Sequence, residues 1–540
     1  MIHAYKNNGY NIIMDVNSGS VHVVEDLSYD AVAYLVLRTE ETKELHKDQV
    51  DEATILKMQP LLAGREPAEA VDRIPDEEVV EALSKEPFSY KPEEIREALE
   101  EIRELTDQEM LFTGDLYENL VIDFKNHKTV VKALCLHVTH DCNLGCKYCF
   151  AEEGEYHGSR GLMSAEVGKR ALDFLIENSG SRRNLEVDFF GGEPTMNWKV
   201  VKELVEYGRK REKEANKNFR FTLTTNGILL NEEIMDFSDR EMANVVMSLD
   251  GRKEVNDRMR PFRNSTKGSY DTLVPKFQKW ADRRNQDRYY IRGTFTRNNL
   301  DFAQDAIHFA DLGFEQMSIE PVVAPSTADY AIREEDIRGI LEQYDILAKE
   351  YIKRKQEGRG FNFFHFMIDL DQGPCIYKRL SGCGAGTEYL AVTPWGDLYP
   401  CHQFVGLEQF KLGDIWTGVQ NTEVVDQFKH CNVYAKEQCR TCFARYYCSG
   451  GCAANSFNFS GSLTGAYEIG CAMQKKRIEC AIMIKAAMAD YAEEHGEEYA
   501  ANLESGFAMN RESGLASSKD GESCGDCDTA DAEHCESCNS

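Results

Sequence analysis

Apolar and polar residues alternate at the start of the chain with the period of a β-strand. Tyr10, Ile12 and Met14 are apolar at every second position, and apolar residues return at 21–24 after the turn-forming segment 17–20. This pattern predicts a β-hairpin close to the N-terminus.

Helical patterns follow the hairpin. Ser28 stands where it can cap a first helix, and Pro92 stands at the first turn of another. The apolar residues of this second helix share one face: Ile95, Leu99 and Ile102. We therefore predict a small α+β module over residues 1–125.

From residue 133 the chain alternates between apolar strand-like runs and amphipathic helices such as 164–179, which Ser164 can cap. Six runs are predicted as strands: 133–140, 185–194, 219–227, 243–251, 289–297 and 314–323. Repeated βα units form parallel sheets, whose ligands bind at the carboxyl ends of the strands. The fold class predicted for 126–365 is α/β, a partial (β/α)6 barrel.

The periodicity fades after about residue 370, where cysteines become frequent. We predict a Cys-rich domain over 366–490 that is held together by metal clusters, with a helix over 478–495. The Gly-, Ser- and Asp-rich remainder, 491–540, is predicted to be an acidic flexible tail.

Composition and charge exclude several classes of protein. The net charge of −30 over 540 residues opposes binding to nucleic acid or to an anionic membrane. No apolar stretch approaches 18 residues and no signal peptide is evident, so a cytoplasmic protein is expected. In such a chain, the 18 cysteines favour metal binding or catalysis over disulfides.

The first cysteine motif, Cys142-x3-Cys146-x2-Cys149, stands at the end of the first predicted strand of the barrel. Three thiolates in a tight loop can hold three irons of a 4Fe–4S cluster and leave the fourth iron open to a ligand. A zinc site is the alternative, but structural zinc needs four ligands in a closed shell.

The motif, with Tyr148 before its last cysteine, resembles that of the radical S-adenosylmethionine (SAM) superfamily. The resemblance implies that the cluster reductively cleaves SAM, with Cys142, Cys146 and Cys149 as catalytic ligands. It also implies a set of SAM-binding residues at the ends of later strands: Gly191, Gly192, Glu193, Pro194, Asn226, Ser248, Asp250 and Arg292. A glycine pair lets the backbone approach a ligand closely, Glu193 can accept from an ammonium and Arg292 can pair with a carboxylate.

A second constellation reads Cys383-x12-Gly396-x4-Cys401, then Cys439-x2-Cys442-x5-Cys448-x3-Cys452, then Cys471. It resembles the seven-cysteine SPASM pattern, which carries two auxiliary 4Fe–4S clusters and so implies three clusters in all. By this resemblance one cluster is ligated by Cys439, Cys442, Cys448 and Cys471, and the nearer one by Cys383, Cys401 and Cys452. Two zinc ribbons are the alternative reading of this spacing.

The remaining cysteines are less informative. Cys375 is either the fourth ligand of the nearer cluster or a spectator that leaves one iron free for a substrate thiolate. In the first case an ordinary base such as His402, with a near-neutral pKa, would activate the sulfur. Cys135 and Cys480 are expected to be core residues. The tail pairs are either a metal clip or flexible thiols: Cys524, Cys527, Cys535 and Cys538.

Residues 1–490, from the segment 1–24 through the segment 382–406, resemble the maturases of the six-cysteines-in-forty-five-residues (SCIFF) peptides. This implies an enzyme that joins a cysteine sulfur of a Cys-rich precursor peptide to a carbon of an acceptor residue, usually threonine. It implies a low-potential electron donor, a flavodoxin or ferredoxin, as a further partner. The module at 1–125 then resembles a winged helix that binds the leader of the precursor by strand addition.

Two alternatives differ in function. An anaerobic sulfatase maturase oxidises cysteine or serine to formylglycine, but typically has an aspartate where this chain has His402. A non-catalytic iron–sulfur electron carrier would not need the Gly191–Pro194 motif.

Overall fold

The first sheet is antiparallel and has three strands in the order β1 (Ile2–Asn7), β2 (Tyr10–Asp15) and β3 (Val21–Val24). The computed structural model describes residues 1–39, 46–118, 129–368, 370 and 376–496. The predicted hairpin is confirmed as β2 and β3. Strand β1 was missed, although Asn8 and Gly9, with φ of 49° and 94°, form the two-residue turn that an Asn-Gly pair favours.

Helices pack against one face of this sheet: α1 (Asp26–Leu37), α2 (His46–Gln49), α3 (Glu52–Leu62), α4 (Asp76–Leu83) and α5 (Pro92–Asp107). Pro92 opens α5 and the predicted apolar face of that helix is buried, as expected. The capping role of Ser28 is wrong. Because α1 begins only one residue after β3, Glu25 occupies the N-cap and Ser28 lies in the first turn.

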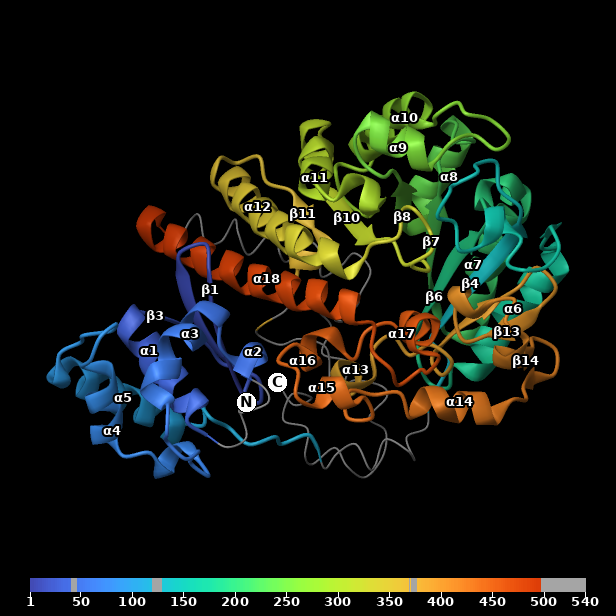
Figure 1. Ribbon diagram of the computed structural model, residues 1–540. Coiled ribbons are helices and arrows are strands. Elements are labelled where there is room, and N and C mark those ends of the chain that lie inside the picture. Colours follow the sequence, from blue (N-terminus) through green and yellow to red (C-terminus); the bar gives the residue numbers. More distant parts are fainter. Residues whose placement is uncertain (40–45, 119–128, 369, 371–375, 497–540) are drawn as a thin grey trace.

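Both faces of the first sheet are buried. Ala4 and Ile13 join the core of the N-terminal helices, whereas Ile12 and Met14 join the core of the rest of the protein. The N-terminal module therefore packs directly on the remainder of the chain (Figure 1).

The large sheet is parallel through eight strands and then continues as an antiparallel meander. Its hydrogen-bonded order is β11 (Asn362–Phe363), β10 (Gln316–Pro321), β9 (Tyr289–Phe295), β8 (Met242–Ser248), β7 (Asn218–Thr225), β6 (Asn184–Gly191), β4 (Ala133–His140), β12 (Tyr389–Val392), β13 (Asp397–Tyr399), β14 (Gly413–Asp414) and β15 (Gly418–Val419), with β5 (Gly161–Leu162) beside β4. All six predicted strands are confirmed. The parallel pairing of β12 with β4 was not predicted, and it joins the Cys-rich region to the sheet.

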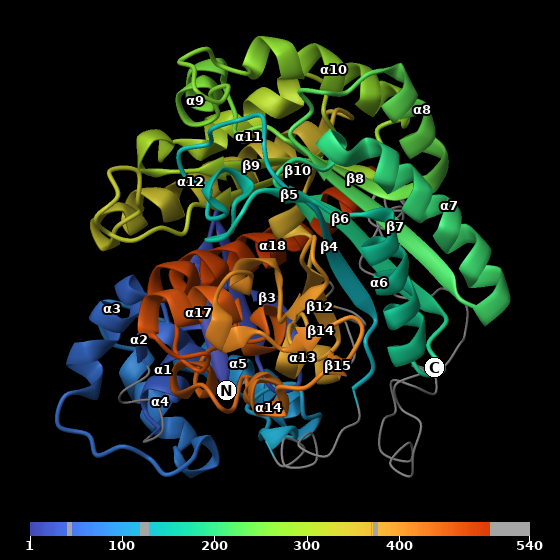
Figure 2. The same ribbon diagram turned by 90° about the vertical axis from the view of Figure 1, so that its right-hand side faces the viewer.

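Helices cover one face of the curved sheet (Figure 2): α6 (Ala165–Asn178), α7 (Trp198–Ala215), α8 (Glu232–Glu241), α9 (Lys253–Met259), α10 (Tyr270–Arg283), α11 (Phe302–Asp311) and α12 (Ile337–Gln356). Ser164 caps α6 by accepting from the Val167 amide at 3.2 Å, as predicted. Along β6, Val187 and Phe189 join the apolar core, while Asp188 lies on the opposite, more polar face.

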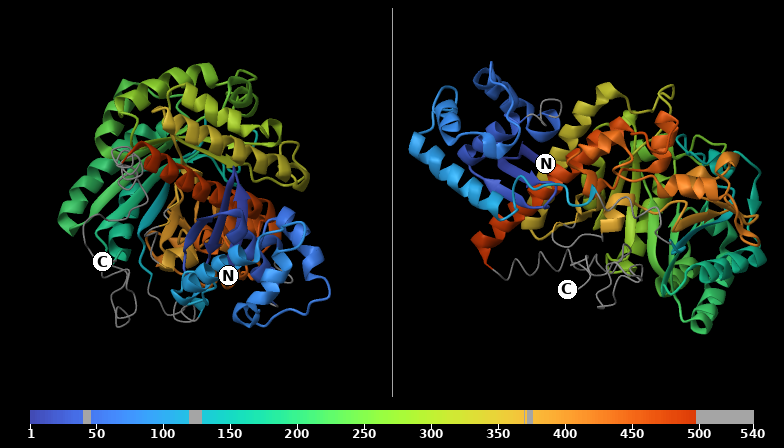
Figure 3. Two further views of the ribbon diagram at one scale, coloured as in Figure 1. Left: turned by 90° about the vertical axis from the view of Figure 1, so that its left-hand side faces the viewer. Right: turned by 90° about the horizontal axis from the view of Figure 1, so that it is seen from below.

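The C-terminal region consists of short helices and one long one: α13 (Ile376–Ser381), α14 (Thr422–Lys429), α15 (Glu437–Arg440), α16 (Arg445–Cys448), α17 (Ala453–Ser460) and α18 (Glu468–His495). Helix α18 starts ten residues before the predicted 478 and so includes Cys471. It lies between α12 and the N-terminal sheet (Figures 1 and 3), where His3 Nε2 is 3.2 Å from Glu479 Oε1. No helix in the described part of the chain is long and apolar enough to span a membrane.

Candidate active site

The loop that follows β4 brings three thiols together. Leu144 forms an antiparallel bridge with Phe262, and the amides of Gly145 and Lys147 donate to the segment 259–261, which fixes the loop. The three thiols are close to one another. Burial raises the pKa of Cys146 most, and the charges of Cys142 and Cys149 raise it further.

These thiols fit a metal cluster electrostatically. Burial raises the pKa of Cys142 and of Cys146 to about 12, so both would be protonated at pH 7 unless a cation bound them. Coordination to iron removes that proton. In the described residues, no three His, Cys, Asp or Glu side chains already form a coordination shell, so the assignment of ligands stays a prediction.

The glycine pair at the end of β6 has a structural reason that the sequence did not reveal. A Cβ on Gly191 would lie 2.1 Å from the Thr139 carbonyl oxygen, and a Cβ on Gly192 would lie 2.0 Å from that of Asp141. The Gly192 and Glu193 amides donate to the same two oxygens at 2.9 Å. The expected reason for the glycines was close approach of the backbone to a ligand. The structure adds a second reason: the glycines let the end of β6 approach the cysteine loop.

Glu193 is fully buried beside this loop. Its Oε1 accepts from the Thr195 amide at 3.0 Å and from the Thr225 hydroxyl at 2.7 Å, and its Oε2 accepts from the Asn226 amide at 2.7 Å. Burial raises its pKa, while these donors lower it. Because Oε2 accepts one bond only, it can accept a further donor such as an ammonium. Pro194, also buried, follows as the first residue of a short 3₁₀ turn.

The other predicted cofactor residues fall in different surroundings. Asn226 Nδ2 lies 3.6 Å from Cys142 Sγ and donates to Asn143 Oδ1 at 2.7 Å. Ser248, half-buried at the end of β8, is in register with Arg292 of β9. The charge of Arg292 lowers the pKa of Glu320 on β10, so this arginine lies in a polar cluster on the sheet.

Asp250 belongs to a closed network that sequence reasoning missed. Its carboxylate accepts from the Tyr148 hydroxyl at 2.7 and 2.8 Å and from the Thr294 amide at 3.1 Å. Arg260 Nη1 lies 3.5 Å from Asp250 and donates to the Tyr148 hydroxyl at 2.9 Å. The sequence carries no signal for Arg260, because its partners are distant along the chain.

The polar cluster on β9 and β10 was also missed. Glu320 lies 3.3 Å from His365 and 3.5 Å from Arg477 of α18. Although burial alone would raise the pKa of Glu320, His365, Arg477 and Arg292 hold it at about 2. Arg477 also donates to the Tyr344 hydroxyl at 2.8 Å, so α18 is tied to α12 and to the sheet.

The expected near-neutral pKa of His402 is wrong. Burial, together with the charge of Arg292, lowers it to about 4, so the imidazole is neutral at pH 7. The ring lies 5.0 Å from Phe190 and 5.7 Å from Phe150, the residue after Cys149.

The thiols of the C-terminal region form two groups. The pKa of Cys448 is raised to about 12, first by burial and then by the charges of three neighbouring thiols: Cys471, Cys442 and Cys439. Cys401 is likewise surrounded by Cys452 and Cys383. Cys135 and Cys480 are buried core residues, as expected. Cys375, Cys524, Cys527, Cys535 and Cys538 lie outside the described residues.

Cys431 is an additional thiol that the seven-cysteine pattern does not contain. It lies near Cys383 and Cys452, and its Sγ donates to the Leu463 carbonyl at 3.2 Å. The only signal in the sequence was its position shortly before Cys439.

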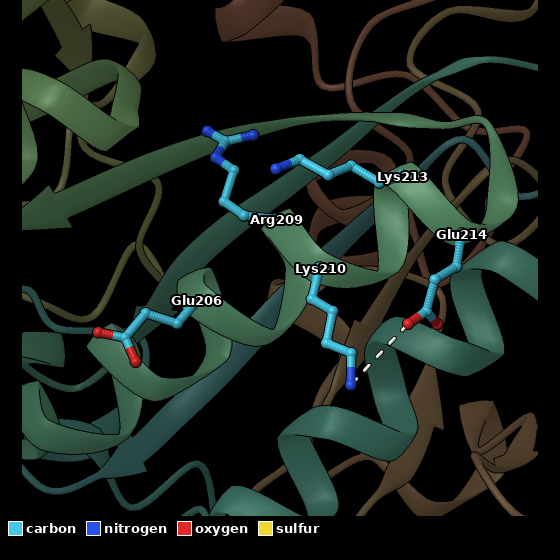
Figure 4. Close-up of a pocket in the computed structure, with 5 residues that line it drawn as sticks. All are labelled: Glu206, Arg209, Lys210, Lys213 and Glu214. Atoms are coloured by element: carbon cyan, nitrogen blue, oxygen red, sulfur yellow. Dashed lines mark ion pairs between the residues drawn. The ribbon is translucent and has the colours of Figure 1, made fainter.

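A surface hollow on α7 has no part in this chemistry. It is lined by charged side chains of one helix (Figure 4): Glu206, Arg209, Lys210, Lys213 and Glu214. Lys210 and Glu214 are 3.9 Å apart, and none of the five belongs to the carboxyl edge of the sheet.

Residues 136–284 match the model of the Radical SAM superfamily. An uncharacterised protein of Methanocaldococcus jannaschii is 32% identical over 314 residues, which are 57% of this chain and 96% of that protein. The chain belongs to the radical SAM superfamily. This family membership implies a 4Fe–4S cluster and SAM as cofactors.

Two further proteins are similar to this radical SAM chain. The cysteine-type anaerobic sulfatase-maturating enzyme of Clostridium novyi is 25% identical over 338 residues, 58% of this chain and 86% of that enzyme. The solved structure of native anSMEcpe with bound AdoMet has a TM-score of 0.54 and 21% identity, and covers 66% of this chain and 99% of that one. This second likeness shows the fold alone.

Proposed function

We propose that this protein is a radical SAM peptide maturase that forms thioether cross-links in a Cys-rich precursor peptide. The observation that carries the proposal is the convergence of Cys142, Cys146 and Cys149 beside the Gly191–Pro194 turn at the carboxyl edge of a parallel sheet. These three cysteines would hold a 4Fe–4S cluster, which would supply the electron for reductive cleavage of SAM and so for removal of a hydrogen atom from the substrate.

The residues of the site have separate tasks in this proposal. The three thiolates hold three irons, and Glu193 Oε2 and Asn226 lie next to Cys142, where they meet the cofactor's polar groups. The buried strand ends exclude water from the radical. Arg292 and Glu320 provide charged groups for the substrate or for the cofactor carboxylate. His365 beside them is neutral at pH 7, because burial lowers its pKa to about 3.

The C-terminal groups of thiols are proposed to hold two auxiliary 4Fe–4S clusters. Their grouping supports the division expected from the SPASM resemblance: Cys439, Cys442, Cys448 and Cys471 in one, and Cys383, Cys401 and Cys452 in the other. We expect about twelve irons per chain if all three clusters form.

The thioether step balances in atoms and electrons. The substrate carbon loses one hydrogen atom to the 5′-deoxyadenosyl radical, which becomes 5′-deoxyadenosine; the cysteine thiol loses a proton, and the C–S bond forms with release of one electron. An auxiliary cluster held by the C-terminal cysteines would accept that electron and so replace the one spent on SAM. The external donor, a flavodoxin or ferredoxin, would then not be consumed in each turnover.

The N-terminal sheet offers an edge for a peptide strand. The Asp15 amide donates to the Ser20 carbonyl at 2.9 Å. Hydrogen-bonded and non-hydrogen-bonded pairs alternate along an antiparallel ladder, so Ile13 and His22 are the next hydrogen-bonded pair. The N–H and C=O of Val23, which lies between, therefore point away from β2. In the described part of the chain β3 is the last strand of its sheet, and Val23 is 50% exposed. This geometry supports binding of a leader by strand addition.

Formylglycine formation is the second candidate, because a relative is named as a sulfatase-maturating enzyme. His402 follows Cys401 where those maturases typically have an aspartate. At pH 7 the buried His402 is neutral and a weaker base than a carboxylate-paired histidine.

The test is anaerobic reconstitution followed by incubation with SAM, reductant and a candidate Cys-rich precursor. We expect about twelve irons, 5′-deoxyadenosine, and a peptide that loses two hydrogen atoms per cross-link while retaining sulfur. Replacement of Cys142, Cys146 and Cys149 by alanine should remove about four irons and all SAM cleavage. Zinc in place of iron would refute the proposal, and loss of sulfur from the peptide would favour formylglycine.

A further inference from the structure

Lys436 is a buried lysine at the N-cap of α15. It is 2% exposed, and its Nζ donates to the Gly450 carbonyl oxygen at 2.8 Å and to Ser456 Oγ at 3.0 Å. Its aliphatic stem packs on Gly450, where a Cβ would lie 3.6 Å from Lys436 Cδ. The ammonium group is therefore held in one place.

Both groups that Lys436 contacts are neutral. In the described part of the chain it makes no ion pair with a carboxylate, whereas Lys475 pairs with Asp48 at 2.5 Å and Lys476 with Asp345 at 2.7 Å. Burial of an unpaired ammonium is strongly unfavourable, because the charge loses its hydration. A charge of this kind persists in a fold when another, opposite charge balances it.

Four thiols that can carry negative charge lie near Lys436: Cys431, Cys439, Cys452 and Cys471. The Cys439 amide donates to the Lys436 carbonyl oxygen at 3.0 Å, and Nζ is bound by the residues that flank Cys452 in the chain, Gly450 and Ser456. Cys439 and Cys471 belong to one proposed cluster and Cys452 to the other. The segment that binds Nζ, 450–456, follows Cys448 of one group and contains Cys452 of the other, so Lys436 contacts the part of the chain that links the two groups.

We propose that Lys436 is a fixed counter-charge shared by the two auxiliary clusters. As a positioning residue it stabilises their reduced states, and so favours transfer to them of the electron that is released when the C–S bond forms. This inference rests on the proposed function, because it requires that the C-terminal cysteines hold clusters.

The experiment is a redox titration followed by electron paramagnetic resonance. It uses the full chain with Cys142, Cys146 and Cys149 replaced by alanine, so that the auxiliary signals are read alone. Lys436→Met removes the charge and keeps most of the stem. At a fixed potential we expect the ratio of reduced to oxidised auxiliary clusters to fall at least about tenfold, which is ~59 mV for a one-electron couple.

Two matched variants separate charge from packing. Lys436→Arg keeps the charge, and Ser456→Ala removes one hydrogen bond but leaves the ammonium in place. Both should remain near the parent protein. If Lys436→Met fails to bind iron while Lys436→Arg binds it, the counter-charge is needed already for assembly, which also supports the proposal.

Three results would overturn it. Lys436→Met could retain iron with unchanged potentials, or all three variants could shift or lose iron equally, which would indicate packing alone. If instead the wild-type chain binds only about four irons, the auxiliary clusters of the proposed function are themselves refuted. Iron analysis before the titration distinguishes this last case.

Discussion

Arg260 gives the most stringent test of the site, because it is a buried charge whose partners are known. Its Nη1 lies 3.5 Å from Asp250 Oδ1 and donates to the Tyr148 hydroxyl at 2.9 Å. Asp250 is fully buried and Arg260 is 8% exposed. Arg260→Leu keeps an apolar part of the side chain and removes the charge, and therefore leaves a buried carboxylate without a cation.

The expected cost follows from this distance. Two unit charges 3.5 Å apart attract by about 5 kcal/mol at an effective dielectric constant of ~20, and removal of one partner of a buried pair typically costs about 3–5 kcal/mol. We expect Arg260→Leu to lower the free energy of unfolding by roughly 3–5 kcal/mol.

The effect depends on pH in a defined direction. Burial raises the pKa of Asp250 in the folded protein, although Arg260 and Tyr148 lower it. A carboxyl group whose folded pKa exceeds its unfolded value, about 3.9, loses stability as the pH rises between the two values. Without Arg260 the folded pKa rises further, so in Arg260→Leu the decline in stability should extend to higher pH than in wild type.

The assay is urea unfolding followed by circular dichroism, at several pH values. The control is Asp250→Asn in the Arg260→Leu background, which removes the uncompensated charge and should restore part of the stability. The reasoning is refuted if Arg260→Leu costs less than about 1 kcal/mol, or if the two substitutions are simply additive.

Three other perturbations address the rest of the site. Gly192→Ala should destabilise the protein by about 1–3 kcal/mol in thermal unfolding and reduce iron loading, because the new Cβ would lie 2.0 Å from the Asp141 carbonyl oxygen. The control is Gly339→Ala, which has open space around it and should leave the unfolding temperature unchanged. Val23→Pro should weaken precursor binding in a fluorescence titration, because it removes an outward N–H, and should spare uncoupled SAM cleavage; unchanged affinity would exclude strand addition at β3. If Cys375 is not a ligand, Cys375→Ala should keep the iron content and the thioether yield. The precursor peptide should then alter the electron paramagnetic resonance signal of the nearer cluster only when the donor cysteines of the peptide are present. Loss of a cluster in Cys375→Ala would show that Cys375 is a ligand.

Local pattern accounted for most of the elements. The six strands of the large sheet were predicted because each carries a compact apolar run followed by polar turn residues, and Ser164 and Pro92 marked helix starts by chemistry that acts within one turn. Strand β1 was missed because its polar residues, such as His3 and Asn7, are buried by segments distant in the chain, among them the later helix α18. The capping role of Ser28 failed because the strand before it continues to residue 24.

The sequence by itself determined the cysteine spacing, the succession of strands along the chain from β4 to β10, and hence the family, since these depend on residues close together in the chain. Only the tertiary structure decided the electrostatics of the site. Arg260 meets Tyr148, Arg477 meets Glu320 and Lys436 lies among thiols of two groups because strands and helices far apart in sequence pack together. Burial and partner charges set pKa values, and both are properties of the packed chain, as the lowered pKa of His402 illustrates.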